Sequence, residues 1–393
     1  MNIVFFHQNG INPKAGGISR ITYNLITELN RRKGINIYAL GLLTNEELEY
    51  PQWQFFLPAK NLDTEANIRY IAAFMEEKNI DILVNQAALN LKTAYFLAKV
   101  HSRCLGVKIV SCIHNSVLTQ IKNYPFQIEH RLLSKNKKIV FKMLSNGLSR
   151  ILLEFISVVM RHKQYVKLVQ CSDKVVMLSP GHCKEMRRML WGRFSQKVDY
   201  IPNCIIDIDQ RVLPKENIVL WIGTVDLSVK RIDYMLDIWK QFEEKKDGWK
   251  LLVLGDGPAL NWAKKQVEIS GLRRVEFLGR VAPDPYYKRA RISCVTSSHE
   301  AFSMVILESL ANGVVPVVNN CFPSASYLIT SGVNGCLAKE FDRNDFVRQL
   351  LSLTSNDSYL NRMAENCLIE ARKYKASVVC DQWINMFHQL LKE

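Results

Sequence analysis

Short apolar runs alternate with helical patterns along almost the whole chain, and this alternation limits the fold more than any other feature. In the first half the apolar runs lie at 2–6, 35–40, 81–86, 108–114, 174–178 and 198–203. In the second half they lie at 217–223, 249–255, 274–279, 292–298 and 314–320. Nearly continuous apolar strands separated by helices are typical of parallel sheets that are covered on both faces. The pattern therefore predicts an α/β protein with doubly wound sheets.

The strand–helix pattern restarts near residue 217, after the polar, aperiodic segment "IPNCIIDIDQRVLPKEN". We interpret this segment as a linker between two Rossmann-like domains, because 393 residues are many for one core. The expected domains are 1–204 and 205–375, and the helix expected at 376–393 could cross back to the first domain. Ligands of such sheets bind beyond the carboxyl ends of the strands, so two facing domains would form a cleft.

The net charge of +15 is unevenly distributed. Residues 131–167 contain nine Lys or Arg side chains and a single acidic residue, Glu154, with apolar residues between them. This predicts basic amphipathic helices inside the first domain. Three interpretations are open: a helix on an anionic membrane surface, a nucleic-acid patch, or a solvated helix face. Nucleic acid is not an expected partner, because neither interleaved exposed aromatic residues nor a named motif is visible.

The ten cysteines have neither CxxC nor His-x3-His spacing, which argues against a zinc site or a disulfide framework and favours buried thiols. The first residues, "MNIVFFHQNG", lack the features of a signal peptide. No uncharged apolar run approaches the roughly 20 residues of a membrane span. We therefore expect a cytoplasmic protein.

Polar and glycine-rich motifs follow several of the expected strands. In "HQNGINPKAGGISR" the pair Gly16 and Gly17 directly precedes a helix, where unhindered backbone N–H groups suit a phosphate, although the same glycines could form only a turn. The spacing is neither GxGxxG nor that of a P-loop. His114 ends the run "KIVSCIH" and would point into the cleft or be satisfied at the strand end.

The second half places three further motifs at carboxyl ends of strands. "WIGTVDLSVKRIDYML" puts Lys230 and Arg231 at a helix start, which is unfavourable for cations unless an anion binds there. "LGDGP" supplies glycines that permit close backbone approach. In "HEAFSMVILESLANG", Glu300 precedes an apolar helix and Glu308 lies within it. A buried carboxylate needs hydrogen-bond donors, unless Glu308 is half-exposed and Glu300 only caps the helix.

These motifs, in this order, resemble the retaining GT-B glycosyltransferases, and family four in particular. The resemblance covers nearly the whole chain and is strongest from 217 to 338. It rests on Gly-Gly after the first strand, "IPN", "IG…KR" at 222–231, "GDGP" at 255–258, "FLGRV" at 277–281, Glu-x7-Glu at 300–308, "G-x-x-PVV" at 313–318 and "G-x-N-G" at 332–335.

The resemblance implies a donor site in the second domain and an acceptor site in the first. Lys230, with Arg231, would hold the donor diphosphate and stabilise the leaving nucleotide as the sugar C–O bond breaks. Glu308 would accept hydrogen bonds from the ribose hydroxyls, which would be its donors. Glu300 would face the donor sugar and stabilise its cationic, oxocarbenium-like centre.

The resemblance also implies roles for neighbouring backbone groups. The helix after Ser303 would direct N–H groups at the same phosphates, and the backbone at Arg280 and Val281 would contact the base. From the first domain, the glycine pair would close over the diphosphate, and His114 would lie near the reacting sugar or acceptor. The implied donor-binding residues are Gly16, Gly17, Thr224, Lys230, Arg231, Arg280, Val281, Phe302, Ser303, Met304 and Glu308, and the implied catalytic residues are Glu300, His114 and Lys230.

Three positions depart from the usual pattern of the family. Thr224 stands where the family usually has Arg, which concerns one phosphate contact. Ser303 ends "EAFS" in place of Glu-Gly-Phe-Gly, and "CFPSAS" follows "PVV" in place of a Gly-Gly turn; both concern the geometry around the donor sugar. The family needs no metal ion, and "DID" at 207–209 falls in the linker, so neither metal nor cofactor is expected.

We therefore expect a retaining glycosyltransferase that moves a sugar from a UDP- or GDP-linked donor to a carbohydrate acceptor. The acceptor would be lipid-linked, as in capsule, O-antigen or exopolysaccharide synthesis. The segment 131–167 would rest on an anionic membrane, at the inner face of the plasma membrane. Two alternatives are open: a nucleotide-sugar epimerase of the same fold, and a non-catalytic protein that binds a nucleotide sugar.

Overall fold

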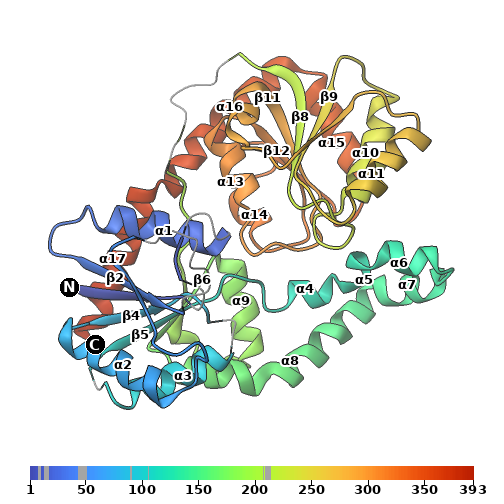
Figure 1. Cartoon of the computed structure of the whole chain (residues 1–393). Helices are drawn as coiled ribbons and strands as arrows, with labels where there is room; N and C mark the ends of the chain where they lie inside the picture. The colour runs from blue at the N-terminus through green and yellow to red at the C-terminus, as the bar shows by residue number, and fades with distance from the viewer. Residues whose placement is uncertain are drawn as a thin grey trace. The chain divides into compact units, whose positions relative to one another are not determined.

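The computed structural model describes residues 1–7, 10–12, 17–42, 51–88, 91–104, 106–206, 208 and 214–393. By their internal contacts these residues form two compact units (Figure 1). Unit 1 consists of Met1–Val117, Val158–Ile206 and Lys375–Glu393, and unit 2 of Leu118–Ser157 and Asp207–Tyr374. Each unit contains one parallel sheet among its described residues, which confirms the predicted α/β class with two doubly wound domains.

The sheet of unit 1 has the order β3-β2-β1-β4-β5-β6-β7. Its strands are β1 (Asn2–Phe6), β2 (Asn36–Gly41), β3 (Gln54–Phe56), β4 (Ile82–Asn85), β5 (Lys108–Cys112), β6 (Lys174–Met177) and β7 (Val198–Tyr200). Its helices are α1 (Gly17–Leu29), α2 (Glu65–Glu77), α3 (Leu91–His101), α9 (Pro180–Met189) and α17 (Ala376–Lys392), with the short 3-10 helix η1 (Ser195–Lys197).

The alternation of side chains along β1 explains why helices cover both faces of this sheet. Ile3 and Phe5 belong to a core cluster with residues of α1 and α17, whereas Val4 and Phe6 belong to a cluster with residues of α2 and α3. Successive side chains of a strand point to opposite faces, so a strand without polar residues needs cover on both. The C-terminal helix α17 thus packs in unit 1, where it contributes Trp383 to the core.

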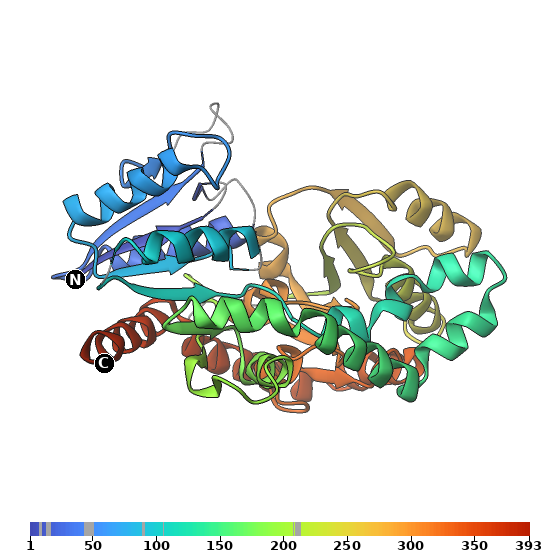
Figure 2. The same ribbon diagram turned by 90° about the horizontal axis from the view of Figure 1, so that it is seen from below.

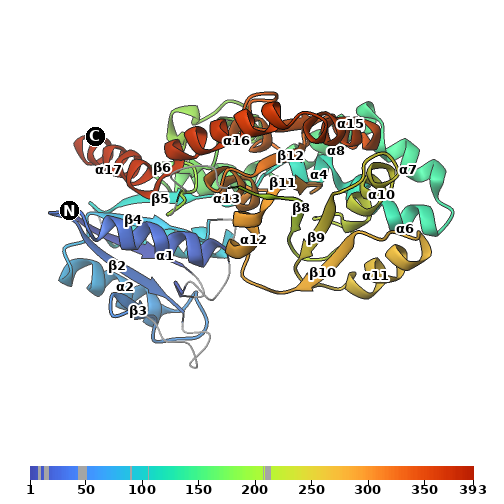
Figure 3. The same ribbon diagram turned by 90° about the horizontal axis from the view of Figure 1, so that it is seen from above.

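The sheet of unit 2 has the order β10-β9-β8-β11-β12-β13. Its strands are β8 (Glu216–Ile222), β9 (Lys250–Leu254), β10 (Val275–Gly279), β11 (Ala290–Val295), β12 (Val315–Asn319) and β13 (Cys336–Ala338). The helices between and after them are α10 (Ile232–Glu243), α11 (Leu260–Ile269), α12 (Asp284–Arg289), α13 (Met304–Ala311), α14 (Ala325–Leu328), α15 (Arg343–Thr354) and α16 (Asp357–Ala371), followed by η2 (Arg372–Tyr374). Helix α16 begins at Asp357, shortly after α15 ends at Thr354, and the two helices are in contact (Figure 3).

Unit 2 also contains a helical insertion that comes from the first half of the chain. We call Leu118–Ser157 the insertion; it holds α4 (Thr119–Lys122), α5 (Tyr124–Gln127), α6 (Glu129–Ser134), α7 (Lys138–Ser145) and the start of α8 (Gly147–Gln170), shown in teal and green in Figure 2. By length and composition none of the described helices could span a membrane alone. The pair α7 and α8, bent by 70° at the break between them, passes that test jointly.

The position of the insertion differs from the predicted division, which kept 1–204 together. Asn123 donates its side-chain amide to the backbone oxygens of Ser298 (2.7 Å) and Cys321 (2.8 Å). The ring of Phe126 stacks on Phe341 with centroids 3.6 Å apart. These contacts join residues well over 100 positions apart, so no local pattern could indicate them, and the boundary of the units falls inside α8.

Candidate active site

The loops after β8 and β11 meet at the topological switch point of the unit 2 sheet. The chain moves outward from β8 to β9 and β10, and restarts with β11 on the other side of β8. In doubly wound sheets, ligands bind beyond the carboxyl ends of the strands at such a point. Lys230 follows β8 and Glu300 follows β11, so the fold places these two predicted residues where a ligand is expected.

Beside the switch point lies an open pocket of about 620 Å³. Its walls come from the ends of three strands and the loops after them: Ile222, Gly223, Thr224, Leu254, Gly255, Asp256, Gly257, Arg280 and Val281. The structure thus brings together three predicted residues, Thr224, Arg280 and Val281. The glycines are required here, because a Cβ atom on Gly255 would lie 1.8 Å from the carbonyl oxygen of Gly223. Only glycine permits such close backbone packing at this point.

Lys230 and Glu300 form an ion pair, with 2.5 Å between Lys230 Nζ and Glu300 Oε1. Ser297 also donates its hydroxyl to the same carboxylate oxygen, at 2.7 Å. Both charged groups are partly accessible, so a ligand could reach them. An ammonium group can stabilise a phosphate, and a carboxylate can stabilise a positively charged sugar carbon. The pair therefore offers both charges that the breaking of a sugar–phosphate bond needs.

The backbone that carries Lys230 is held by a tight turn around Asp226. The Asp226 carboxylate accepts N–H groups of Ser228 (2.8 Å), Val229 (2.6 Å) and Lys230 (3.1 Å). The Lys230 carbonyl accepts the hydroxyl of Thr296 at 2.8 Å. Aspartate commonly fixes turns in this way. The loop therefore presents the ammonium group from a fixed backbone.

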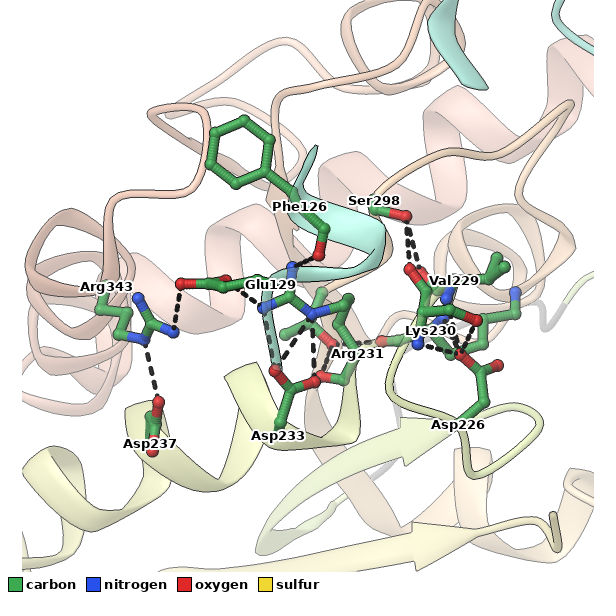
Figure 4. A network of polar contacts seen from close by, with 12 residues as sticks. Phe126, Glu129, Asp226, Val229, Lys230, Arg231, Asp233, Asp237, Ser298 and Arg343 are labelled. Carbon is green, nitrogen blue, oxygen red and sulfur yellow. Dashed lines mark hydrogen bonds and ion pairs between the residues drawn. The ribbon is translucent and has the colours of Figure 1, made fainter. Parts of the chain in front are cut away.

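Arg231 does not share the role of Lys230, and the predicted pairing of the two on a diphosphate is corrected here. Its side chain is 1% exposed and donates to both oxygens of Asp233, to Glu129 and to the carbonyl of Phe126 (Figure 4). Burial alone would lower the pKa of this guanidinium, but the carboxylates of Asp233 and Glu129 outweigh burial and raise that pKa. The backbone explains the direction of the side chain: Arg231 is left-handed (φ 58°), which turns it away from Lys230.

Glu308 receives a hydrogen bond from a tyrosine that the sequence did not single out. The Tyr287 hydroxyl donates to Glu308 Oε2 at 3.0 Å. Burial, and then the charge of Glu308, raise the pKa of Tyr287 well above its usual value, so the phenol stays protonated and keeps donating. Glu308 itself is half-buried on α13.

The turn between β11 and α13 contains polar atoms that lack a partner within the described part of the chain. Ser303 Oγ and His299 Nδ1 are buried and have no hydrogen-bond partner there. Ser303 is the N-cap of α13 but its side chain makes no capping bond. Burial lowers the pKa of His299, although Glu300 opposes this effect, so the ring is neutral at pH 7. Buried polar atoms without partners are costly, and a polar ligand would satisfy them.

Two other predicted residues beside this turn have different surroundings. The Phe302 side chain is buried, and its ring lies edge-on to Tyr374 at 6.3 Å between centroids. Met304 begins α13 and is half-buried. Phe302 therefore contributes packing to the turn that carries Glu300, while the predicted contact of these residues with a donor stays a prediction.

The remaining predicted residues belong to unit 1. Gly16 lies outside the described residues. Gly17 begins α1, and a Cβ atom there would meet nothing within 4 Å. His114, after β5, hydrogen-bonds through Nε2 to Gln86. Burial, and then His7, lower the pKa of His114 to about 4, so this ring is neutral at pH 7; its predicted place near the reacting sugar stays a prediction.

Several residues of the site were not predicted from the sequence. A local pattern indicates Asp226, because Asp two residues before Ser is typical of a turn that is fixed by the Asp side chain. Ser297 and His299 adjoin Glu300 and could have been noted for that reason. No local sequence pattern indicates Glu129 or Tyr287, since their contacts depend on partners far away in the sequence.

Solved structures share this architecture over the whole chain. The apo form of the lipopolysaccharide outer core galactosyltransferase WaaB covers 99% of this chain with 99% of its own, at a TM-score of 0.73 and 17% identity. HepE of Anabaena in complex with UDP covers 99% of this chain with 100% of its own, at a TM-score of 0.73 and 16% identity. At such identities the likeness shows the fold, and the predicted GT-B fold is confirmed.

Sequence comparison finds related proteins and a matching family model. An uncharacterized glycosyltransferase of Haemophilus influenzae is 24% identical over 56% of this chain and 62% of its own length. The "GalNAc-alpha-(1->4)-GalNAc-alpha-(1->3)-diNAcBac-PP-undecaprenol alpha-1,4-N-acetyl-D-galactosaminyltransferase" of Campylobacter jejuni is 23% identical over 45% of this chain and 49% of its own length. The chain therefore spans about half to three fifths of these relatives. Residues 206–368, less than half of the chain, match the family model "Glycosyl transferases group 1".

Proposed function

We propose that the protein transfers a sugar from a nucleotide-sugar donor to a carbohydrate acceptor. The observation that carries this proposal is the Lys230–Glu300 pair, which lies at the switch point of the unit 2 sheet, in the part of the chain that matches the glycosyltransferase group 1 model, beside a glycine-lined pocket. HepE, of the same fold, binds UDP and glucose in its solved complexes, which supports a donor of this class.

In the proposed reaction, the bound donor separates the ammonium group of Lys230 from the carboxylate of Glu300. The nucleoside diphosphate would neutralise Lys230, which stabilises the leaving group as its negative charge grows. Glu300 would then face the sugar, whose anomeric carbon becomes positive in the transition state. The N–H groups at the start of α13 would contact the same phosphates, and Glu308 would accept ribose hydroxyls.

The finer parts of the proposal concern mechanism. We place the enzyme among the retaining glycosyltransferases of family four, on the resemblance of the ordered motifs between 217 and 338. Transfer would be independent of metal ions, with Lys230 supplying the cation that neutralises the diphosphate. UDP and GDP are the two donor nucleotides that this proposal favours, and the open pocket next to Arg280 would hold the base.

The acceptor and the location are also part of the proposal. The names of the similar proteins include an undecaprenol-linked oligosaccharide and the biosynthesis of amylovoran. We therefore propose a lipid-linked acceptor in the synthesis of a surface polysaccharide. Such an acceptor would be reached from an anionic membrane, at the cytoplasmic face of the plasma membrane.

The first test incubates the protein with nucleotide sugars, with and without lipid-linked oligosaccharide acceptors, and analyses products by mass spectrometry. Glycosyl transfer by the wild-type protein but not by Glu300→Ala supports the proposal. Conversion of the donor to an isomeric nucleotide sugar without acceptor would instead identify an epimerase. Nucleotide-induced thermal stabilisation without turnover under any condition would identify a binding protein.

A thermal-stability screen with UDP, GDP, ADP, CMP and their sugar conjugates identifies the donor base. A ligand at about 100 times its Kd adds roughly 2.7 kcal/mol of stability, which raises the melting temperature measurably. One nucleotide series should stabilise the wild-type protein and not Glu308→Ala. If Glu308→Ala responds as fully as the wild type, the assigned role of Glu308 is wrong.

A further inference from the structure

The first part of α8 exposes an apolar stripe where a soluble helix would be polar. Leu148, Ile151, Leu152, Phe155 and Ile156 follow the spacing of one helix face and are 44–79% exposed. Side chains of this size normally occupy a core, and an isolated exposed one needs no explanation. Five on one face form a patch.

Helix α7 has two apolar faces, of which only one packs against the rest of the insertion. Phe141 packs edge-on against Phe126, with 5.8 Å between ring centroids, and this contact holds α7 to the rest of the insertion. Ile139, Val140 and Met143 point elsewhere and are 40–77% exposed. The helix therefore needs only one of its apolar faces for folding, and the second adds to the patch on α8.

Exposed basic side chains accompany the apolar ones. Between 131 and 157 the insertion carries six Lys or Arg residues and one acid, Glu154. Arg150 is engaged with Glu340 at 2.7 Å, whereas Lys135, Lys137, Lys138 and Lys142 are exposed. Apolar residues bordered by lysines are the pattern of helices that lie in the interface of an anionic bilayer.

We propose that α7 and the first half of α8 form a docking surface for an anionic lipid bilayer, with the apolar side chains in the interface and the lysines at the headgroups. The choice of occupant rests on charge: a second copy would bring like charges together, and a nucleic acid would leave the apolar stripe in water. This inference extends the proposed function, because it brings the donor-binding unit to the membrane that holds a lipid-linked acceptor.

The test is flotation of the full-length protein with vesicles of phosphatidylcholine alone or with about one quarter phosphatidylglycerol. Binding should require the anionic lipid and be lost in 1 M salt. Lys137→Ser/Lys138→Ser/Lys142→Ser should weaken binding on the order of 100-fold, from roughly fivefold per lysine. Ile151→Ser/Phe155→Ser should weaken it at least about tenfold. All five side chains are partly or largely exposed, so the variants should fold.

Matched controls lie on the same unit. Ile269→Ser/Ile369→Ser removes two exposed apolar side chains from other helices, and Lys264→Ser/Lys265→Ser removes two exposed lysines. Both controls should float as the wild type does. Equal flotation with and without anionic lipid, or equal loss in the controls, overturns the proposal. Retention in alkaline carbonate also overturns it, because α7 and α8 would then be inserted rather than docked.

Two further measurements separate the possible failures. If sedimentation velocity finds a dimer that Ile151→Ser/Phe155→Ser dissociates, the surface is an interface between copies and the bilayer proposal is wrong. The nucleotide-induced thermal shift is recorded for every variant. A normal shift without flotation refutes only the docking surface, whereas flotation without any shift in the wild type refutes the donor site and leaves docking intact.

A separate observation concerns α5 and α6 of the same insertion. Glu129 and the carbonyl of Phe126 accept hydrogen bonds from Arg231, whose neighbour in the chain is Lys230 (Figure 4). Arg343 approaches Glu129 at 3.6 Å from the other side and pairs with Asp237 at 3.0 Å. A left-handed arginine is strained, and these contacts are what hold its backbone in place.

We infer that Glu129 and Arg231 are positioning residues, which set the place of Lys230 through the backbone that the two cations share. Glu129→Gln should raise the donor KM about tenfold at a temperature well below its melting point. Glu129→Asp, which keeps the charge, should recover part of the loss. Asp237→Asn, at the exposed end of the same network, should leave KM unchanged. A lower melting temperature with unchanged KM and kcat in Glu129→Gln would show a merely structural pair and overturn the inference.

Discussion

Lys230 and Arg231 are adjacent cations, and each forms an ion pair, but the two pairs differ in burial. The side chains of Lys230 and Glu300 are 24% and 13% exposed, whereas those of Arg231 and Glu129 are 1% and 11% exposed. A ligand can separate the first pair, and opening the second would leave buried charges unpaired. The left-handed backbone of Arg231 thus accompanies the change from an accessible ion pair at Lys230 to a buried one at Arg231.

The largest expected effect is on stability, at the buried pair. Arg231→Met leaves the buried carboxylate of Asp233 without its cation and leaves Glu129 with only the more distant Arg343, which should cost about 3–5 kcal/mol of unfolding free energy. Lys230→Met, the matched change one residue earlier, should cost less, because the ammonium group of Lys230 is 24% exposed and Glu300 keeps the hydrogen bond from the Ser297 hydroxyl. Urea unfolding of both variants measures the difference. Equal losses would remove the distinction between the pairs.

The next effect is on catalysis, at the accessible pair. Lys230→Met removes the cation that would stabilise the leaving diphosphate, and kcat should fall about 100- to 1000-fold, or roughly 2.7–4 kcal/mol. The loss should persist at saturating donor, because the missing interaction strengthens in the transition state. Steady-state kinetics with the donor found in the screen give the value. A rise in KM alone, with normal kcat, would reduce Lys230 to a ground-state contact.

Burial also lowers the pKa of one side chain in unit 1, His114, and the dependence of stability on pH tests how large this effect is. The pKa of His114 is lowered to about 4, so unfolding raises it and the unfolded chain binds the extra proton. Stability from this group is present above about pH 6.5 and is lost as the pH falls toward 4, by about 2 kcal/mol between pH 7 and pH 5. Chemical unfolding at both pH values should show this loss in the wild type and a smaller one in His114→Gln. Identical losses would mean that His114 is not held neutral.

The smallest expected effect concerns Glu308, a half-buried carboxylate held by a neutral donor. Tyr287→Phe removes the 3.0 Å hydrogen bond that helps to orient the Glu308 carboxylate. Nucleotide affinity should fall about fivefold, or roughly 1 kcal/mol. Isothermal titration of wild type and variant with the same nucleotide measures it. Unchanged affinity would show that the tyrosine stabilises the fold without orienting Glu308.

The sequence alone determined the layered α/β architecture and the edge of the sheet at which the site lies. Both depend on local patterns: strands such as β8 and β11 are short apolar runs, and polar residues after a parallel strand must lie at its carboxyl end. For that reason the local pattern is enough to assign Lys230 and Glu300 to one edge of the sheet, and to place the glycines of "GDGP" at that same edge.

Only the tertiary structure decided the position of the insertion and the direction of Arg231. Asn123 and Phe126 contact residues 175 or more positions away, and Glu129 meets Arg231 across 102 positions. Neither hydrophobic periodicity nor a motif carries information over such separations, because both reflect neighbours along one helix or strand. The left-handed backbone of Arg231 is likewise set by its distant partners, since an arginine by itself disfavours that conformation.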